Sequence, residues 1–319
     1  MRIGLRGLIL LLFALSVASL FVGVSAIGPL DLLHPTPAQL EVLRLSRIPR
    51  LASLILAGAG MSIAGLLMQQ LIGNKFVEPT TAGTTDTASL GVLVALLLVP
   101  GAPPLAKMLI AFGFALAGTM TFMRILNRIP FREPILIALV GLMFGGIVGS
   151  AAMFLAQKYD LLQSLSGWLY GDFSAVLQGR YEMLYVSAPL IAIAYVYADR
   201  FTIAGMGEHF AISLGLPYRY VVNIGLAIVA LVTAVILLTV GSLPFLGLIV
   251  PNIVSLYRGD NLRLNLPHTA LLGANFLLLC DILGRTLIHP YEIPVGMIVG
   301  VAGSGIFLAM LLKRRRSHA

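Results

Sequence analysis

Long runs of apolar residues, separated by short polar segments, recur along almost the whole of the 319-residue chain. Each run approaches the roughly 20 residues that an α-helix needs to cross a hydrocarbon core of about 30 Å. No soluble domain fits between them. The pattern predicts an all-α polytopic membrane protein, a single transmembrane domain over residues 1–319, with about ten transmembrane helices near 6–27, 51–71, 85–99, 105–126, 134–156, 181–199, 219–240, 244–257, 266–285 and 294–312.

Composition supports a bilayer as the solvent, because 59% of the residues are hydrophobic and the mean hydropathy is +0.98. The first run follows basic residues and ends in Val-Ser-Ala, as a cleavable signal peptide would. Since further runs follow it, we expect an uncleaved first helix. The net charge of +8 is scattered over the ends of the runs, without a basic stripe, so we do not expect nucleic acid as a partner.

The distribution of Lys and Arg indicates the orientation in the membrane. If the N-terminus is cytoplasmic, 14 of the 21 basic residues lie inside and 7 outside, which favours two cytoplasmic termini. The inside set is Arg2, Arg6, Lys75, Arg124, Arg128, Arg132, Arg200, Arg219, Arg258, Arg263, Lys313, Arg314, Arg315 and Arg316.

Three of the outside charges, Arg44, Arg47 and Arg50, crowd into one loop, "VLRLSRIPR". A cationic patch on that side is suited to an acidic extracytoplasmic partner, because complementary charge steers docking. Arginines that snorkel to lipid headgroups at a helix end would look the same. The residues alone leave both interpretations open.

Small residues form a stripe along the fifth predicted span, where Gly141, Gly145 and Gly149 recur every four residues. Such stripes let helix backbones approach closely in lipid. Plain bundle packing explains the stripe, and a lining of the transport pathway is the sharper alternative.

The chain has no H-E-x-x-H, no cluster of histidines at ligand spacing and no nucleophile with a plausible base. We therefore predict neither an enzyme nor a metal site. No lysine follows a G-x-x-x-x-G loop, so nucleotide phosphates cannot be held by that motif. Any ATP-driven work must come from another subunit, and we expect no cofactor on this chain.

Polar residues near membrane depth fall into two groups. Asp281 and Arg285 share one helix face at i,i+4 spacing and could pair with each other. The second group is the hydroxyl-rich segment 74–91, which includes Asp86 and begins with Asn74. N-capping accounts for one or two hydroxyls, and a cytoplasmic gate or polar lining is the alternative for the run Thr80, Thr81, Thr84, Thr85, Thr87 and Ser89.

The stretch "GMGEHFAISLGLPYRY", residues 205–220, interrupts two apolar runs with a short helix bounded by glycines. On a helical wheel Phe210, Ala211 and Leu214 share one face, while Ile212 and Leu216 lie on the other, one turn beyond Glu208. One apolar face can rest on the bundle, and the second points to a groove on a partner. A helix lying among lipid headgroups is the alternative, although such helices usually carry more Lys and Arg.

Several long segments resemble the membrane subunits of type II ABC importers for ferric siderophores, haem and cobalamin. The resemblance covers about residues 47–313. It rests on "RIPRLASLILAGAGMSIAGLLMQQLIGNKFVEPTTAG", on "SLSGWLYGDFS" around Trp168, on "GEHFAISLGLPYRYV" and on "GSLPFLGLIVPNIVSLYRGDNLRLNLPHTALLGANFLLLCDILGRTLIHPYEIPVG".

The resemblance implies a ten-helix permease in the bacterial inner membrane. It pairs with a second copy or a paralogue, binds two ATPase subunits that carry the ATP, and receives cargo from a periplasmic binding protein. Segment 205–217 corresponds to the coupling helix, with Glu208, Phe210, Ile212, Leu214, Gly215 and Leu216 toward the ATPase. Arg47, Arg50 and Arg285 match docking positions for the binding protein. The loop 74–83 matches the cytoplasmic gate region of the family. With the threonine run and the glycine stripe described above, the predicted gate and pathway set is Asn74, Thr80, Thr81, Thr84, Gly141, Gly145 and Gly149.

The chain departs from the family pattern at two places, and the second resembles a siderophore subgroup more than the cobalamin one. Asn252 stands where many relatives carry histidine, and "NKFVEPTTAG" replaces a segment richer in small apolar residues. The predicted function is therefore import of an iron(III)–siderophore complex. A haem or cobalamin permease of the same family is the alternative, and an ion-gradient-driven transporter is a more distant one.

Overall fold

The computed structural model describes residues 4–23, 36–129, 134–179, 181–288 and 290–316. Arg2 and Arg132, used above for the orientation, lie outside these ranges. The side chains of Trp168, Lys313, Arg314, Arg315 and Arg316 are also outside the described part.

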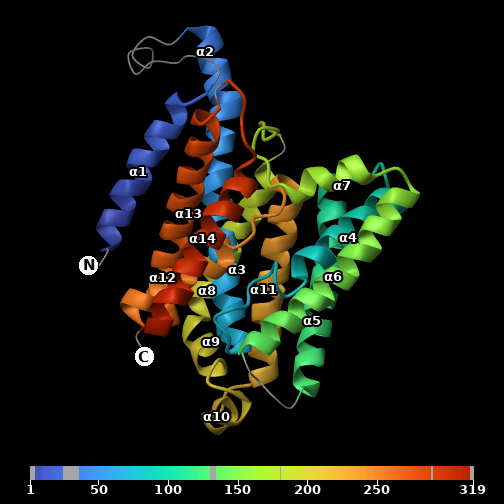
Figure 1. Ribbon diagram of the computed structural model, residues 1–319, viewed down its shortest axis with the longest axis vertical. Coiled ribbons are helices and arrows are strands. Elements are labelled where there is room, and N and C mark those ends of the chain that lie inside the picture. The colour runs from blue at the N-terminus through green and yellow to red at the C-terminus, as the bar shows by residue number, and fades with distance from the viewer. Residues whose placement is uncertain (1–3, 24–35, 130–133, 180, 289, 317–319) are drawn as a thin grey trace.

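The described chain is built entirely of helices and their connections (Figure 1). In order they are α1 (Leu5–Phe21), α2 (Pro37–Val42), η2 (Leu43–Arg47), α3 (Ile48–Ile72), α4 (Thr84–Leu98), α5 (Pro104–Arg128), α6 (Pro134–Lys158), α7 (Leu162–Leu169), η3 (Glu182–Val186), α8 (Ser187–Val196), α9 (Ala198–Ala204), α10 (Glu208–Ser213), α11 (Tyr218–Val240), α12 (Leu246–Arg258), α13 (Leu262–Thr286) and α14 (Val295–Arg316).

Six of these described helices are long and apolar enough to cross a membrane: α3 with the turns before it, α5, α6, α11, α13 and α14. Residues 182–196 and 198–204 form a pair bent by 64° that makes a seventh span if counted as one. The first, third and eighth predicted windows fall on shorter apolar helices, α1, α4 and α12. The predicted count of about ten is therefore not confirmed, while the all-helical class is.

Two breaks in the backbone explain why α4 and α12 are short. Gly83, at φ 75°, precedes α4, and Phe245, at φ 63°, precedes α12. Both residues adopt the left-handed conformation, which a continuing α-helix excludes. The predicted windows 85–99 and 244–257 begin close to these breaks and are short for the same reason.

The centre of the bundle is α3, which packs against α11, α12 and α13. Glycines permit these close approaches: a Cβ at Gly58 would lie 2.7 Å from the carbonyl oxygen of Gly273, and one at Gly65 would collide with the backbone of Gly247. At the periphery, α6 and α14 are the least buried of the candidate spans.

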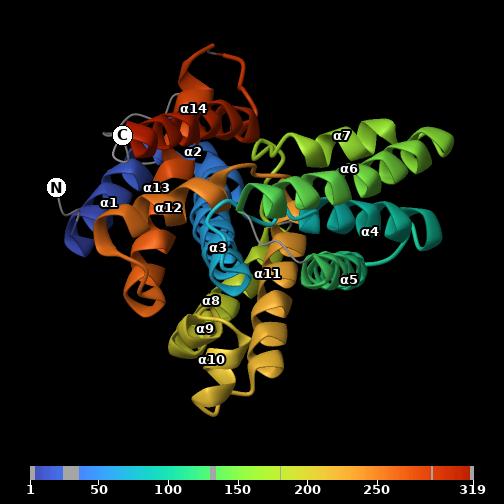
Figure 2. The ribbon, with the colours of Figure 1, turned by 60° about the horizontal axis from the view of Figure 1, so that its bottom comes forward.

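The short helices mark opposite ends of the molecule. Figures 1 and 2 place α2 at one end and α10 at the other, and we call these the α2 end and the α10 end. The described part of α1 begins, and that of α14 ends, toward the α10 end (Figure 1). The start of α1 and the end of α14 therefore lie toward the same end of the molecule, and the two helices run in opposite directions (Figure 1).

Candidate functional site

The loop between α3 and α4, residues 73–83, is bound to α12 along its length. Gly73, at φ 68°, ends α3 in the left-handed conformation. The side chain of Asn252 donates a hydrogen bond of 2.7 Å to the carbonyl of Lys75. The ammonium group of Lys75 in turn lies 2.8 Å from a carboxylate oxygen of Asp260. Asn252, one of the departures from the family pattern, thus joins α12 to this loop.

Glu78 is the buried anchor of the loop. It is 1% exposed, and its carboxylate accepts hydrogen bonds of 2.9 Å from the backbone N–H of Phe245 and 2.5 Å from the hydroxyl of Thr80. The N–H of Phe245 stands at the start of α12, where a negative charge interacts favourably with the helix dipole. Burial, only partly offset by these hydrogen bonds, raises the pKa of Glu78 to about 7.

Gln69 adds a second bond between α3 and α12. It is 7% exposed, and its side-chain amide donates to the carbonyl oxygens of Gly247 at 3.1 Å and Leu248 at 3.3 Å. Together with Glu78 it fixes the first turn of α12 against α3 and the loop. We call the unit of Gln69, Glu78 and the first turn of α12 the Glu78 brace.

The predicted hydroxyls are used inside the loop and between helices. Thr81 accepts from the N–H of Glu78 and donates to its carbonyl, which shapes the turn. Thr84, fully buried, bonds to the hydroxyl of Thr119 on α5 at 2.8 Å. Gly83 is the N-cap of α4, without a side-chain cap. N-capping of α4 therefore accounts for none of these threonines. Asn74, also buried, accepts from the N–H of Phe76.

The glycine stripe of α6 lies against this loop and α4. A Cβ at Gly141 would collide with the carbonyl of Thr81, and one at Gly145 would lie 2.6 Å from a carboxylate oxygen of Asp86. At Gly149 the distance to Asp86 would be 3.4 Å. The structure thus brings the predicted gate threonines and the predicted glycine stripe together, and their role in transport stays a prediction.

The predicted coupling segment projects from the α10 end as a six-residue helix between Gly207 and Gly215 (Figure 1). Phe210, Ile212 and Leu214 are 49%, 56% and 59% exposed. The helix ends at Ser213, but the N–H of Leu214 still donates to the carbonyl of Phe210. Both side chains are exposed, whereas Ala211, which the wheel placed on the same face, is buried.

Only two apolar residues of the segment turn toward the bundle. Ala211 is fully buried, and Leu216 packs half-buried against the core. Exposed apolar side chains of this size at one end of a molecule mark an interaction surface. We call Phe210, Ile212 and Leu214 the α10 patch.

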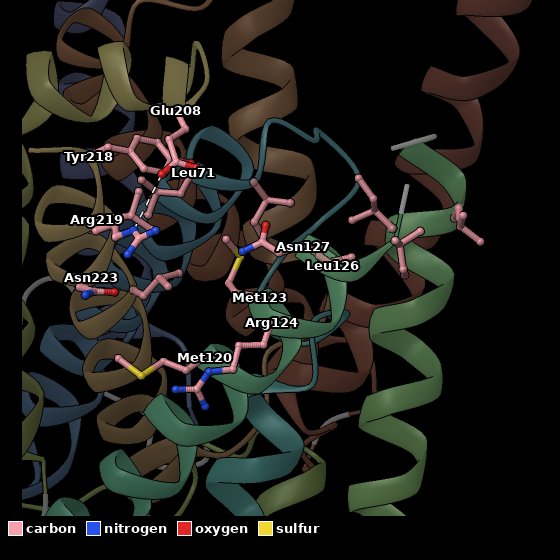
Figure 3. A pocket seen from close by; sticks show the side chains of 16 residues that line it. Leu71, Met120, Met123, Arg124, Leu126, Asn127, Glu208, Tyr218, Arg219 and Asn223 are labelled. Carbon is pink, nitrogen blue, oxygen red and sulfur yellow. Dashed lines mark ion pairs between the residues drawn. The ribbon is translucent and has the colours of Figure 1, made fainter. Parts of the chain in front are cut away.

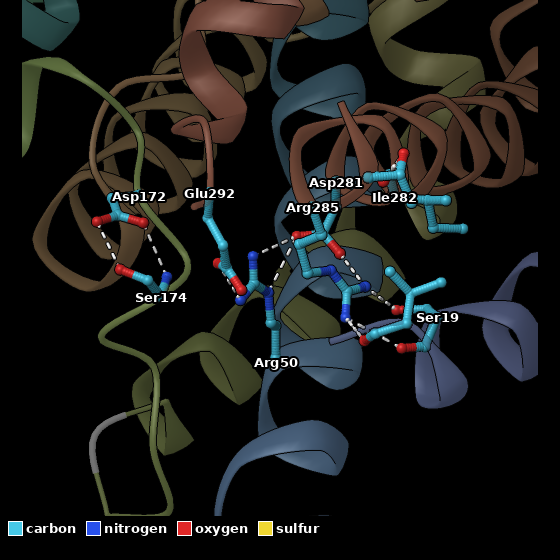
Figure 4. A network of polar contacts seen from close by, with 10 residues as sticks. Ser19, Arg50, Asp172, Ser174, Asp281, Ile282, Arg285 and Glu292 are labelled. Atoms are coloured by element: carbon cyan, nitrogen blue, oxygen red, sulfur yellow. Dashed lines mark hydrogen bonds and ion pairs between the residues drawn. The ribbon is translucent and has the colours of Figure 1, made fainter. Parts of the chain in front are cut away.

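At the α2 end a network of charged side chains connects α1, α3 and α13 (Figure 4). Arg50 donates to Asp281 at 2.8 and 3.0 Å and to Glu292 at 2.8 Å. Arg285 pairs with the other carboxylate oxygen of Asp281, as its i,i+4 spacing predicts, and donates at 2.7 Å to the hydroxyl of Ser19. Asp281 is fully buried between the two guanidinium groups.

The predicted docking arginines therefore already have partners inside the chain. Arg47, at 7% exposure, donates to the carbonyl of Leu20, and Arg285, at 5%, donates to carbonyls at the end of α1. The segment predicted as a loop is helical, with Arg44 and Arg47 on η2 and Arg50 on α3, and Arg44 is the exposed one of the three. The docking role of Arg47, Arg50 and Arg285 stays a prediction.

Sequence reasoning did not find Glu78, although it lies within the predicted gate segment. Its partner Phe245 is 167 residues away, so no local spacing reveals the contact. The usable signal is a carboxylate next to a proline in a chain with only 11% charged residues. A buried acid in such surroundings needs donors, and a helix N-terminus supplies them.

Comparison with known proteins gives a consistent result. Residues 9–313 match the FecCD transport family. The petrobactin import system permease protein YclN of Bacillus subtilis is 61% identical over 98% of each chain. The ferric-anguibactin transport system permease protein FatD of Vibrio anguillarum is 41% identical, over 96% of this chain and 98% of its own.

A solved structure described as an inward-facing conformation of a metal-chelate type ABC transporter superposes with a TM-score of 0.82. It covers 97% of this chain and 98% of its own, at 23% identity. At that identity the likeness shows the fold alone. The same architecture therefore accommodates widely divergent sequences.

Proposed function

Because the chain belongs to the FecCD transport family, we propose that it is the permease subunit of an ATP-binding-cassette importer that carries an iron(III)–siderophore complex into the cytoplasm. It is a multi-pass membrane protein and a transport component, not an enzyme. The cargo class is that of petrobactin.

One observation carries this proposal: identity of 61%, over 98% of both chains, with a petrobactin import permease. A second relative, at 41%, is named for ferric anguibactin, which is again an iron–siderophore cargo.

The α10 patch is the proposed point of energy input. Three exposed apolar side chains, Phe210, Ile212 and Leu214, are suited to the groove of a separate ATPase subunit. In this proposal the remaining coupling residues position α10 and do not themselves enter the ATPase groove; they are Glu208, Gly215 and Leu216. ATP binds to and is hydrolysed on the partner, and this chain holds no cofactor of its own.

The Glu78 brace is the proposed link between that input and the transport pathway. It fixes the loop with Thr80 and Thr81 to α12, so a displacement of α12 moves the gate residues with it. Asn74, Thr84 and the stripe Gly141, Gly145 and Gly149 complete the proposed gate. Alternating access then follows as a population shift driven by a ligand on another chain.

The assembly that we propose contains a second permease copy or paralogue, two ATPase subunits and a periplasmic binding protein. The α10 end, with both termini, faces the cytoplasm, and the α2 end faces the binding protein. The docking surface carries the exposed cation Arg44. The less exposed Arg47, Arg50 and Arg285 hold the helices below that surface in place.

Uptake into proteoliposomes tests the function. The complex is reconstituted with its ATPase subunits and binding protein. Transport of radiolabelled ferric petrobactin across the vesicle membrane is then measured with and without ATP on the side of the membrane that carries the ATPases. We expect uptake that requires ATP and resists a protonophore. Uptake that persists without ATP and stops with the protonophore contradicts the proposal. ATP-driven uptake of cobalamin or haem in place of ferric petrobactin corrects the cargo alone.

A further inference from the structure

A cavity of about 590 Å³ opens near the α10 end, between the ends of α3, α5 and α11 (Figure 3). Its size lies in the range of ligand-binding cavities. None of the predicted gate or docking residues lines it, so it is separate from the Glu78 brace and from the charged network.

The wall of the cavity is largely apolar. Leu71 and Ile72 come from the end of α3, Leu126 lies near the end of α5, and Val222 and Leu226 lie on α11. These side chains offer a surface for hydrocarbon rather than for a small polar solute.

Hydrogen-bond donors gather along the same cavity. Figure 3 shows the side chains of Arg124 and Arg219 extending into the space between α5 and α11, and the amides of Asn127 and Asn223 lie on the same two helices. Glu208 is the acid among the lining residues, and its carboxylate is 3.8 Å from Arg219. With two guanidinium groups and one carboxylate, the lining carries net positive charge.

Arg124, like the amides of Asn127 and Asn223, has no side-chain partner among the described residues. A planar guanidinium is well suited to a phosphate oxygen pair. The guanidinium of Arg219 and the amides of Asn127 and Asn223 supply further hydrogen-bond donors for a phosphate.

We propose that this cavity binds an anionic phospholipid, with the phosphate on Arg124 and Arg219 and an acyl chain along the apolar wall. Free phosphate would use the donors but leave the apolar wall facing water. The position also favours lipid, because α5 ends and α11 begins at this level and basic pockets between membrane helices bind anionic headgroups. This proposal does not rest on the proposed cargo.

Retention of lipid by the purified full chain tests the site. The protein is equilibrated in detergent with equal amounts of phosphatidylglycerol and phosphatidylcholine, washed, and analysed by native mass spectrometry. We expect the wild type to retain phosphatidylglycerol selectively. The Arg124→Gln/Arg219→Gln variant should lose that selectivity, by about fivefold for each arginine removed. Arg128→Gln, on α5 but outside the cavity, should behave as the wild type.

A charge-retaining variant and a phosphate challenge separate the remaining outcomes. Arg124→Lys/Arg219→Lys should keep selectivity for the anionic lipid in part, which supports a charge-based site over a loss of folding. Undiminished selectivity in the double Gln variant, or equal loss in Arg128→Gln, overturns the proposal. Displacement of the lipid by inorganic phosphate, with phosphate bound in its place, overturns the assignment to lipid.

Discussion

The two ends of the bundle are marked by different groups of side chains. At the α2 end Arg50, Asp281 and Arg285 are buried and paired with one another. At the α10 end large apolar side chains are exposed on a helix of six residues. The first arrangement holds helices together, and the second leaves a surface that the chain itself does not cover. The contrast teaches that buried charge here serves the fold. Exposed leucines occur at both ends, Leu40 among them, so the case for a partner at the α10 end rests on three apolar side chains gathered on one short projecting helix.

The largest expected effect comes from removing the anion of the charged network. Asp281→Ala leaves two guanidinium groups, those of Arg50 and Arg285, without their shared partner in a buried site. Such a loss typically costs about 3–5 kcal/mol. We expect a large fall in the melting temperature of the detergent-purified protein.

The matched control is Asp199→Ala, which breaks the pair with Arg263. Both side chains of that pair are more than half exposed, and exposed pairs contribute about 0–1 kcal/mol. Equal melting shifts for the two variants would show that the buried network is no more important than a surface pair.

The next effect is a pH dependence that arises from Glu78. Its pKa is raised from 4.5 to about 7 in the folded protein, so the folded state binds the proton more tightly than the unfolded state. This contribution to stability is fully present below the unfolded pKa and is lost as pH rises through about 7. The shift corresponds to about 3 kcal/mol. The melting temperature should therefore fall as the pH is raised from about 5 to about 8, the range that spans the unfolded and folded pKa values.

Glu78→Gln should flatten that profile. The amide oxygen can still accept from the N–H of Phe245, so the Glu78 brace keeps its main contact without a titrating group. Glu182→Gln, at an exposed position, is the control and should leave the slope unchanged. An unaltered slope in Glu78→Gln would assign the pH dependence to other groups.

Binding of the ATPase subunit should depend on the α10 patch. Leu214→Arg places a charge beside Phe210 and Ile212. It should weaken the binding free energy by about 2 kcal/mol or more, the scale of an interface hot spot, and so reduce co-purification of the ATPase subunit. Leu40→Arg, at a similarly exposed leucine of the α2 end, should leave co-purification intact. Neither exposed position should alter the melting temperature. Normal co-purification of Leu214→Arg removes the patch from the interface.

The smallest effect is expected for docking of the binding protein. Arg44→Glu reverses the exposed charge on η2 and should weaken docking several-fold at low ionic strength, and less in high salt. Melting should not change. Arg47→Glu, at a buried position, should instead lower the melting temperature. Docking that is indifferent to Arg44→Glu at low salt argues against this surface.

The sequence predicts those features of the fold that depend on local pattern. Apolar runs locate the helices, and Gly207 and Gly215 bound α10 as expected. The Asp281–Arg285 pair follows from i,i+4 spacing and is confirmed. Which apolar residues of the α10 segment turn inward was not predictable, because the helix ends at Ser213 and the wheel assumed a longer one.

Contacts between distant residues explain the rest of what the sequence does not show. Arg50 and Asp281 are 231 residues apart, so the loop arginines look free for a partner until the fold brings an acid to them. The polar contacts at the start of α12 are equally hidden, because Glu78 and Gln69 supply them from another segment. The predicted windows 219–240 and 244–257 already separated α11 from α12, but the contacts that fix the start of α12 could not be predicted.

Site-specific photocrosslinking of the assembled complex tests the central claim most directly. A photoreactive residue is placed at Ile212 in the α10 patch or at Leu40 at the α2 end, two positions of similar exposure. We predict crosslinks to the ATPase subunit from position 212 alone, and to the binding protein from position 40. Crosslinks to the ATPase from position 40 and not from position 212 contradict both the orientation and the coupling role.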